Sequence, residues 1–308
     1  MPPIRLAIVG LGKIARDQHV PAIAATAGIE LVAVASRNAS LDGIAHYATL
    51  EELLAQAPEV DAVALCTPPQ PRRSQAMAAL AAGKHVLLEK PPGATTSEIA
   101  PLVASSREQG LTLFATWHSR FAPAVAPARA FLARHRPRSV TVTWKEDVRI
   151  WHPGQDWIFE PGGLGVFDPG INALSILTAI LPELIFVIGA ELAFPANRQA
   201  PIAAELTLAG VSGLPIHAAF DFRQTGQQTW SIHIETEAGM LQLDSGGTRL
   251  SHGDRVVVDE PEREYPEIYR RFVELIGERR SEVDLSPLSL VADALLLGRR
   301  RSVEPFEH

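Results

Sequence analysis

The sequence predicts an α/β protein in which a doubly wound parallel sheet comes first and an α+β domain with an open mixed, mainly antiparallel sheet follows. Strand and helix patterns alternate over the first 120 residues, whereas strand patterns dominate the remainder. A chain of 308 residues also suits two domains of about 150 residues each. We therefore expect domains at residues 1–120 and 121–308, and leave open whether the C-terminal helix packs back on the first domain.

The expected strands of the first domain are continuously apolar, as in a parallel sheet that helices cover on both faces. The strands are expected at 5–9, 30–36, 62–66, 85–89 and 111–116, and the helices at 14–27, 50–55, 73–82 and 97–109. In the second domain polar and apolar residues alternate, for example over 231–235, which is typical of a sheet covered on one face. Its strands are expected at 139–147, 184–194, 202–209, 215–222, 229–236 and 240–244, and its helices at 128–135, 169–181, 266–279 and 287–300.

The composition excludes several classes of protein. With 46% hydrophobic and 20% charged residues, the chain is an ordinary globular protein. A net charge of −7 without a long basic run argues against a nucleic-acid partner. The single cysteine, Cys66, cannot form an internal disulfide, which indicates a reducing compartment. Without a signal-peptide pattern or a membrane span, the expected location is cytoplasmic.

A glycine-rich loop follows the first expected strand directly. In the G-x-G-x-x-A spacing of residues 10–15, Gly10 permits a tight turn and Gly12 lets the backbone approach a pyrophosphate. The start of the next helix offers partial positive charge to the same anion. This loop predicts a dinucleotide site that includes Gly10, Gly12, Lys13 and Ile14.

The end of the second expected strand indicates which dinucleotide binds. It carries Ser36 and Arg37, and the nearby carboxylate, Glu30, begins the strand instead of ending it. An NAD site usually has an acidic residue at the strand end, whereas a guanidinium offers a bidentate fork to a 2′-phosphate. We therefore expect NADP as the preferred cofactor, with NAD as the alternative.

Two further strand ends complete the expected cofactor site. Ligands of open α/β sheets bind outside the carboxyl ends of the strands. These ends carry Cys66, Thr67, Pro68, Glu89 and Lys90. Lysine is rare here, because only four of the 28 basic residues are lysines: Lys13, Lys84, Lys90 and Lys145.

The segments 10–15, 67–68, 82–86, 89–91 and 162–168 resemble the Gfo/Idh/MocA oxidoreductases, and the resemblance extends over essentially the whole chain. It implies a Rossmann domain, a second α/β domain, and hydride transfer to or from a sugar or polyol at their junction. Within the family the chain is most similar to aldose 1-dehydrogenases acting on L-arabinose or D-galactose. The segments that carry this closer similarity are 15–19, 114–120, 144–149, 151–155 and 160–175.

Two positions depart from the common pattern of the family. The Asp-x-x-x-His pair of many members is Asp168 and Asn172 in this chain, and an asparagine cannot act as a general base. Arg72 stands where many members have histidine, and its role is left open.

The resemblance implies oxidation of an aldopyranose at C1 to the aldonolactone, with Lys90, Asp168 and Asn172 as the catalytic group. Either a neutral Lys90 takes the hydroxyl proton, or Asp168 takes it while Lys90 donates a hydrogen bond to the sugar. The alternative for Asp168 is a helix cap ahead of Pro169. The expected substrate contacts are His118, Glu146, Trp151, His152, Asp168, Asn172 and Trp230, whereas Trp144 and Trp157 suit core packing.

Other functions stay open on the sequence alone. One is oxidation of a secondary hydroxyl of a sugar or cyclitol, which would yield a keto sugar instead of a lactone. Another is a non-catalytic regulator that binds dinucleotide and sugar. The ten histidines show no zinc-binding spacing, so no metal is expected. A homodimer through the C-terminal sheet is also left open.

Overall fold

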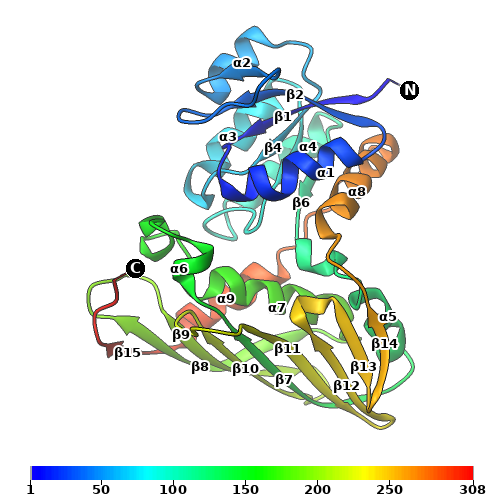
Figure 1. Cartoon of the computed structure of the whole chain (residues 1–308), viewed down its shortest axis with the longest axis vertical. Coiled ribbons are helices and arrows are strands. Elements are labelled where there is room, and N and C mark those ends of the chain that lie inside the picture. Colours follow the sequence, from blue (N-terminus) through cyan, green and yellow to red (C-terminus); the bar gives the residue numbers. More distant parts are fainter. Residues whose placement is uncertain (1, 308) are drawn as a thin grey trace. The chain divides into compact units, whose positions relative to one another are not determined.

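The protein is described here by a computed structural model that covers residues 2–307. The chain forms two compact units (Figure 1). Unit 1 contains residues up to His118 and the segment from Tyr265 to Asp284, and unit 2 contains the rest. The chain leaves unit 1 after His118 and returns to it with the penultimate helix, while the last helix belongs to unit 2.

Unit 1 is built on a six-stranded sheet whose paired strands all run parallel. The order β3-β2-β1-β4-β5-β6 reverses between β1 and β4, which is the topological switch point where such sheets bind ligands. The strands are β1 (Ile4–Val9), β2 (Ile29–Ala35), β3 (Ala45–Tyr47), β4 (Ala62–Leu65), β5 (His85–Leu88) and β6 (Leu113–Ala115). The expected doubly wound parallel sheet is confirmed, with β3 as a short extra strand.

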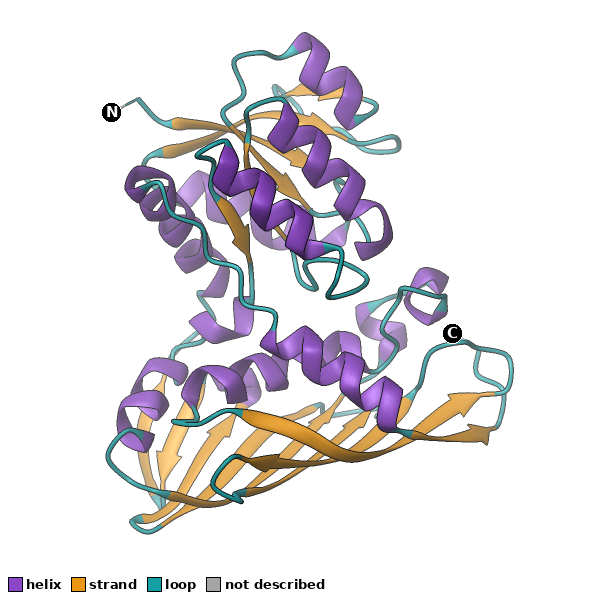
Figure 2. Cartoon of the chain, turned by 180° about the vertical axis from the view of Figure 1, so that it is seen from behind, coloured by secondary structure: helices purple, strands orange, loops and turns teal. Residues whose placement is uncertain are grey.

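Helices cover both faces of this sheet (Figures 1 and 2). A π-helical turn (Ala15–His19) leads into α1 (Val20–Ala25), and the others are α2 (Leu50–Gln56), α3 (Pro69–Ala81), α4 (Ile99–Glu108) and α8 (Glu264–Glu278). The returning helix α8 is amphipathic, and its buried residues recur at helical spacing. They are Tyr265, Ile268, Tyr269, Phe272 and Leu275. This apolar face explains why α8 is part of the unit 1 core.

Unit 2 contains a nine-stranded sheet in the order β14-β13-β12-β11-β7-β10-β9-β8-β15. Only the β7–β10 and β8–β15 pairs are parallel, so the expected mixed and mainly antiparallel sheet is confirmed. The strands are β7 (Pro137–Lys145), β8 (Ile185–Pro195), β9 (Ala203–Gly210), β10 (Pro215–Asp221), β11 (Thr229–Thr236), β12 (Gly239–Asp244), β13 (Arg249–His252), β14 (Arg255–Asp259) and β15 (Arg299–Val303).

Helices α5 (Val125–Leu132), α7 (Phe167–Ile180) and α9 (Ser286–Leu297) cover one face of this sheet, and the other face is open (Figure 2). The alternation of β7 fits this arrangement, because Val142 and Trp144 are buried while Thr141 is exposed. A Cβ at Gly170 of α7 would lie 3.1 Å from the ring of Phe220 on β10. The glycine thus lets α7 approach the sheet closely.

The end of the last expected helix was wrong. Residues 299–300 were expected in the last helix, but that helix ends at Leu297 and Arg299 begins β15, which pairs in parallel with β8. Gly298 lies at the change, where a Cβ would come within 2.5 Å of the carbonyl oxygen of Ala294. The arginines of β15 are exposed on an edge strand, where charge hinders pairing with other chains.

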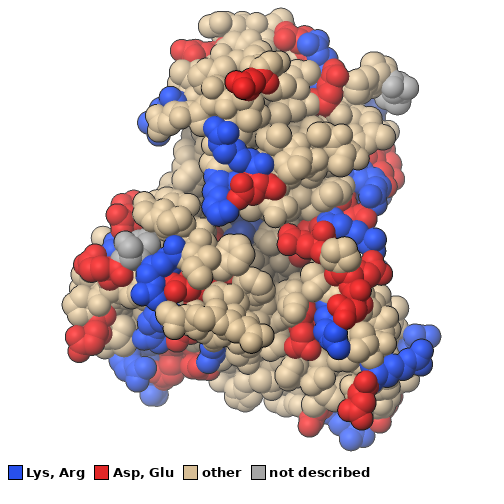
Figure 3. Space-filling model, in the orientation of Figure 1, with Lys and Arg blue, Asp and Glu red and all other residues tan. Residues whose placement is uncertain are grey.

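Within residues 2–307, no helix is both long and apolar enough to cross a membrane. On the face of the molecule shown in Figure 3, lysine and arginine side chains are interspersed with aspartate and glutamate. That mixture is not the continuous basic surface that binds a phosphate backbone.

Candidate active site

The predicted cofactor residues of unit 1 meet at the carboxyl edge of its sheet. Gly10 follows β1, Ser36 follows β2, Cys66 follows β4 and Glu89 follows β5. Hydrogen bonds between strand ends connect these loops: Gly10 donates to Ala35 at 2.9 Å, Cys66 to Val9 at 2.8 Å and Glu89 to Leu65 at 3.2 Å. The structure therefore brings together four segments that are widely separated in the sequence.

The glycine loop has the geometry that a bound dinucleotide needs. Gly10 has φ 89°, and a Cβ there would lie 2.9 Å from both the backbone nitrogen and Cγ2 of Thr67. A Cβ at Gly12 would meet no atom within 4 Å, so the space beside the loop is open. Ile14 is exposed, although it is apolar. The residues present therefore fit a pyrophosphate beside this loop, ahead of the helical residues 15–25.

The end of β2 carries positive charge. Arg37 is exposed directly after the strand, whereas Glu30 lies at the opposite end, 4.0 Å from the guanidinium of Arg5. Arg16, which the sequence did not single out, donates to the carbonyl oxygen of Ser40 at 3.3 Å and thus lies beside the loop after β2. Its position as a cation in the first helical turn after the glycine loop could have identified it from the sequence.

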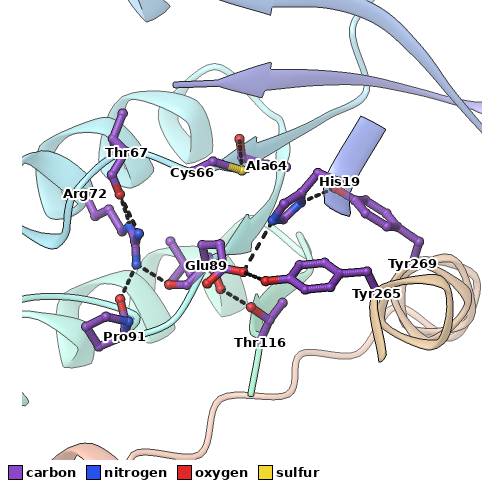
Figure 4. A network of polar contacts seen from close by, with 11 residues as sticks. His19, Ala64, Cys66, Thr67, Arg72, Glu89, Pro91, Thr116, Tyr265 and Tyr269 are labelled. Atoms are coloured by element: carbon purple, nitrogen blue, oxygen red, sulfur yellow. Dashed lines mark hydrogen bonds and ion pairs between the residues drawn. The ribbon is translucent and has the colours of Figure 1, made fainter. Parts of the chain in front are cut away.

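A buried polar network surrounds Glu89, the residue before Lys90 (Figure 4). Lys90 is half-buried, and the carboxylate of Glu89 before it is fully enclosed. This carboxylate accepts a hydrogen bond from the Tyr265 hydroxyl at 2.6 Å and lies 3.3 Å from Nε2 of His19. The other ring nitrogen of His19 lies 2.6 Å from the Tyr269 hydroxyl.

Glu89 and His19 form a buried ion pair. Burial by itself lowers the pKa of His19, but Cys66 and Glu89 together raise it to about 10. Burial by itself raises the pKa of Glu89, but His19, His118 and Tyr265 lower it to about 2. Both groups are therefore charged at neutral pH.

Helix α8 also supports His118. The imidazole stacks on the ring of Tyr265, with the centroids 5.6 Å apart and the planes 19° apart. His118 follows β6 closely and is half-buried. His19, Tyr265 and Tyr269 were not among the site residues expected from the sequence. The spacing of the two tyrosines by four residues on one face of α8 was the signal that could have found them.

In unit 2 the structure brings Asp168 and His152 together. Oδ2 of the buried Asp168 lies 3.1 Å from Nε2 of His152. The reading of Asp168 as a helix cap is wrong, because α7 begins at Phe167 and its N-cap is Val166. The preceding residue Val166 already has helical angles, so Asp168 lies inside the first turn and its side chain pairs with histidine instead.

Asn172 lies one turn after Asp168 on the same helix face. Its side chain is half-buried, and within residues 2–307 the amide makes no hydrogen bond to another group of the protein. An amide both donates and accepts, so Asn172 has capacity for a ligand hydroxyl.

Three other predicted substrate contacts form one group in unit 2. Trp230 donates from Nε1 to the buried carboxylate of Glu146 at 2.8 Å. The Trp151 ring lies 5.6 Å from the Trp230 ring, centroid to centroid, at an angle of 56°. The buried Trp144 packs behind Trp230, at 6.4 Å, whereas Trp157 donates to Gln155. Trp144 therefore has the core position expected for it, whereas Trp157 is only half-buried.

The lysines have different surroundings. Lys84 donates to the carbonyl oxygens of Val60 at 2.6 Å and Pro58 at 3.0 Å, which makes it a structural residue. Lys13 pairs with Asp17 one turn later. Lys145 lies on the face of β7 opposite to the buried Trp144. Across residues 2–307, no three His, Cys, Asp or Glu side chains are grouped so as to hold a metal ion.

Comparison with known proteins gives consistent matches. The family profile Gfo/Idh/MocA, described as an oxidoreductase family with an NAD-binding Rossmann fold, matches residues 4–116. A galactose 1-dehydrogenase of Pseudomonas fluorescens is 51% identical over 307 residues, which cover 99% of each chain. The crystal structure of a D-galactose-1-dehydrogenase protein from Rhizobium etli is 58% identical, with a TM-score of 0.95, and covers 100% of this chain and 99% of that one. A 3-ketoreductase from Actinomadura kijaniata, solved with NADP, shares the fold at 21% identity and a TM-score of 0.85, over 98% of this chain and 99% of its own.

Proposed function

Because the chain belongs to the Gfo/Idh/MocA family of NAD-binding oxidoreductases, we propose that it oxidises an aldopyranose such as D-galactose or L-arabinose at C1 to the aldonolactone. The observation that carries this proposal is 51% identity to a galactose 1-dehydrogenase over 99% of both chains. The two candidate sugars share much of their ring stereochemistry, so one pocket can accept both.

The cofactor side of the reaction is assigned to unit 1. The backbone of Gly10, Gly12, Lys13 and Ile14 binds the pyrophosphate, and the loops after β4 and β5 bind the nicotinamide end through Cys66, Thr67, Pro68, Glu89 and Lys90. When bound, the nicotinamide supplies the hydride acceptor. Support comes from the close approach of Gly10 to Thr67 and the open space at Gly12.

The sugar side is assigned to Asp168, Asn172 and their neighbours. Asp168 accepts the proton of the C1 hydroxyl, and its contact with His152 at 3.1 Å supports this role, because the histidine holds the carboxylate in one orientation. Lys90 donates a hydrogen bond to O1 or to the ring oxygen. Hydroxyls are bound by Asn172, Glu146, His118 and His152, and the rings of Trp151 and Trp230 pack on the C–H face of the sugar. The alternative arrangement has a neutral Lys90 as the base.

Asp168→Asn tests the assigned base. We expect kcat to fall roughly 10²–10⁴-fold, because a positioned base typically contributes that factor. The matched control is Asp156→Asn, since the side chain of Asp156 is 65% exposed and pairs with Arg198. Initial rates are followed by the absorbance of the reduced nicotinamide. If Asp168→Asn has the same kcat as the control, Asp168 is not the base.

Product identity tests the reaction itself. Purified protein is incubated with a panel of aldoses and with NADP or NAD, and the products are identified by NMR. A lactone supports oxidation at C1, whereas a keto sugar rejects it in favour of a secondary hydroxyl. Binding of NADP without reduction across the panel would favour the regulator.

We propose that NADP is the preferred cofactor and that Arg37 contacts the 2′-phosphate. Arg37→Asp should then lower the ratio of kcat/KM for NADP to that for NAD roughly 10–100-fold, as for the loss of a charged hydrogen bond of about 1.5–3 kcal/mol. Arg107→Asp, at an exposed position of α4, is the charge-matched control. An unchanged ratio in Arg37→Asp would exclude Arg37 as the phosphate contact.

A further inference from the structure

Arg72 is a buried arginine that has no assigned role in the proposed reaction. It lies near the start of α3 and is 4% exposed, whereas the next residue, Arg73, is exposed. Arginine is almost never fully buried unless its donors find partners. The partners of Arg72 therefore indicate what it does.

The guanidinium of Arg72 donates to three backbone carbonyl oxygens (Figure 4). Nε donates to the oxygen of Thr67 at 2.9 Å, and Nη2 donates to the same oxygen. Nη1 donates to the oxygens of Glu89 and Pro91. These last two residues are the immediate neighbours of Lys90, so the guanidinium holds the backbone on both sides of that lysine.

The hydrogen bonds of Arg72 lie just beyond the end of the pairing between β4 and β5. Strands β4 and β5 pair as far as Leu65 and Leu88, and the amide of Glu89 still donates to Leu65 at 3.2 Å. Beyond that bond Arg72 connects the two loops, because its contacts reach Thr67 on one loop and Glu89 and Pro91 on the other.

We propose that Arg72 is a positioning residue that fixes the direction of the Lys90 side chain by holding the Thr67 and Glu89–Pro91 loops together. The proposal rests on the proposed function of Lys90. Only arginine offers five N–H donors in a rigid planar fork, whereas lysine has one compact ammonium group. The guanidinium therefore reaches three carbonyl oxygens at once.

The kinetic test compares Arg72→Gln with the neighbouring control Arg73→Gln. We expect Arg72→Gln to lower kcat roughly 10²-fold, as a small misplacement of a catalytic group does. Arg72→Lys should recover only part of the loss, and Arg73→Gln should have wild-type kcat. A wild-type kcat in Arg72→Gln would overturn the proposal.

A double-mutant cycle with Lys90→Met separates positioning from a general structural role. Single-turnover rates are measured with enzyme in excess for both single variants and for the double variant. If Arg72 acts through Lys90, Arg72→Gln costs little more once Lys90 is methionine, because coupled residues are not additive. An equal loss in both backgrounds would show that Arg72 acts independently of Lys90 and would overturn the proposal.

The two proposals fail in different ways. Wild-type turnover in Lys90→Met refutes the role of Lys90 itself, and the positioning role falls with it. Slow turnover in Lys90→Met together with wild-type turnover in Arg72→Gln refutes only the positioning role. If Arg72→Gln does not fold, Arg72→Lys, which keeps the charge, replaces it in the double-mutant cycle with Lys90→Met. An equal loss of rate in both backgrounds again overturns the proposal.

Discussion

Replacement of Lys90 by arginine is expected to lower kcat roughly 10²–10⁴-fold, the range typical of a positioned acid or base, while the protein still folds and binds NADP. Arginine keeps the positive charge, but it does not lose its proton and its planar group is larger than an ammonium group. Both arrangements of the proposed reaction are therefore impaired. A neutral base is lost in one, and a compact hydrogen-bond donor to the sugar oxygen is lost in the other.

The matched control is Lys145→Arg. Lys145 lies on β7 in unit 2, on the face opposite to the buried Trp144, and has no part in the proposed chemistry. Its substitution should leave kcat unchanged. Near-wild-type kcat in Lys90→Arg would refute the role of Lys90, whereas loss of NADP binding would mean that the variant disturbs the cofactor site as a whole.

Local sequence patterns were sufficient to predict five of the six strands of unit 1 and the loops that follow them. Strand periodicity and the glycine spacing are local properties, and parallel strands necessarily bring their carboxyl ends to one edge. Gly10, Ser36 and Glu89 were placed there by this reasoning, and the structure places them there. The one-sided covering of the second sheet followed from alternation in the same way.

Long-range pairings could not be predicted from local patterns. Tyr265 is 176 residues from its partner Glu89, and Tyr269 is 250 residues from His19. No short window contains both members of such a pair. The reading of Asp168 as a cap failed for a related reason, since the local Asp-Pro pattern carries no information about His152.

The His19–Glu89 ion pair should make the stability of the protein depend strongly on one buried carboxylate. Glu89→Gln is expected to lower the free energy of unfolding by about 3–5 kcal/mol, because removing one partner leaves the other charge buried without compensation. Glu51→Gln, at an exposed position of α2, is the control and should have little effect. Urea unfolding curves provide the measurement.

The pKa shifts of Glu89 and His19 set the pH range in which wild type and Glu89→Gln differ most in their free energy of unfolding. The pKa of Glu89 is about 2 in the folded protein, below its usual 4.5, so its contribution is present above pH 4.5 and is lost as the pH falls toward 2. Cys66 and, to a smaller extent, Glu89 raise the pKa of His19 to about 10, above its usual 6.5, so the contribution of these contacts is present below pH 6.5 and is lost as the pH rises through 10. The stability difference between wild type and Glu89→Gln should therefore be largest between pH 4.5 and 6.5.

The pH dependence of this stability difference distinguishes an ion pair from a contact that stabilises by packing alone. A change in packing alone would give the same difference in unfolding free energy at about pH 5.5 and about pH 9.5, whereas loss of the pair gives a smaller difference at the higher pH. The double variant His19→Gln with Glu89→Gln removes both charges, so it should lose less stability than the sum of the two single variants. Additive losses together with a pH-independent difference would show that the two groups are not a charged pair in the folded protein.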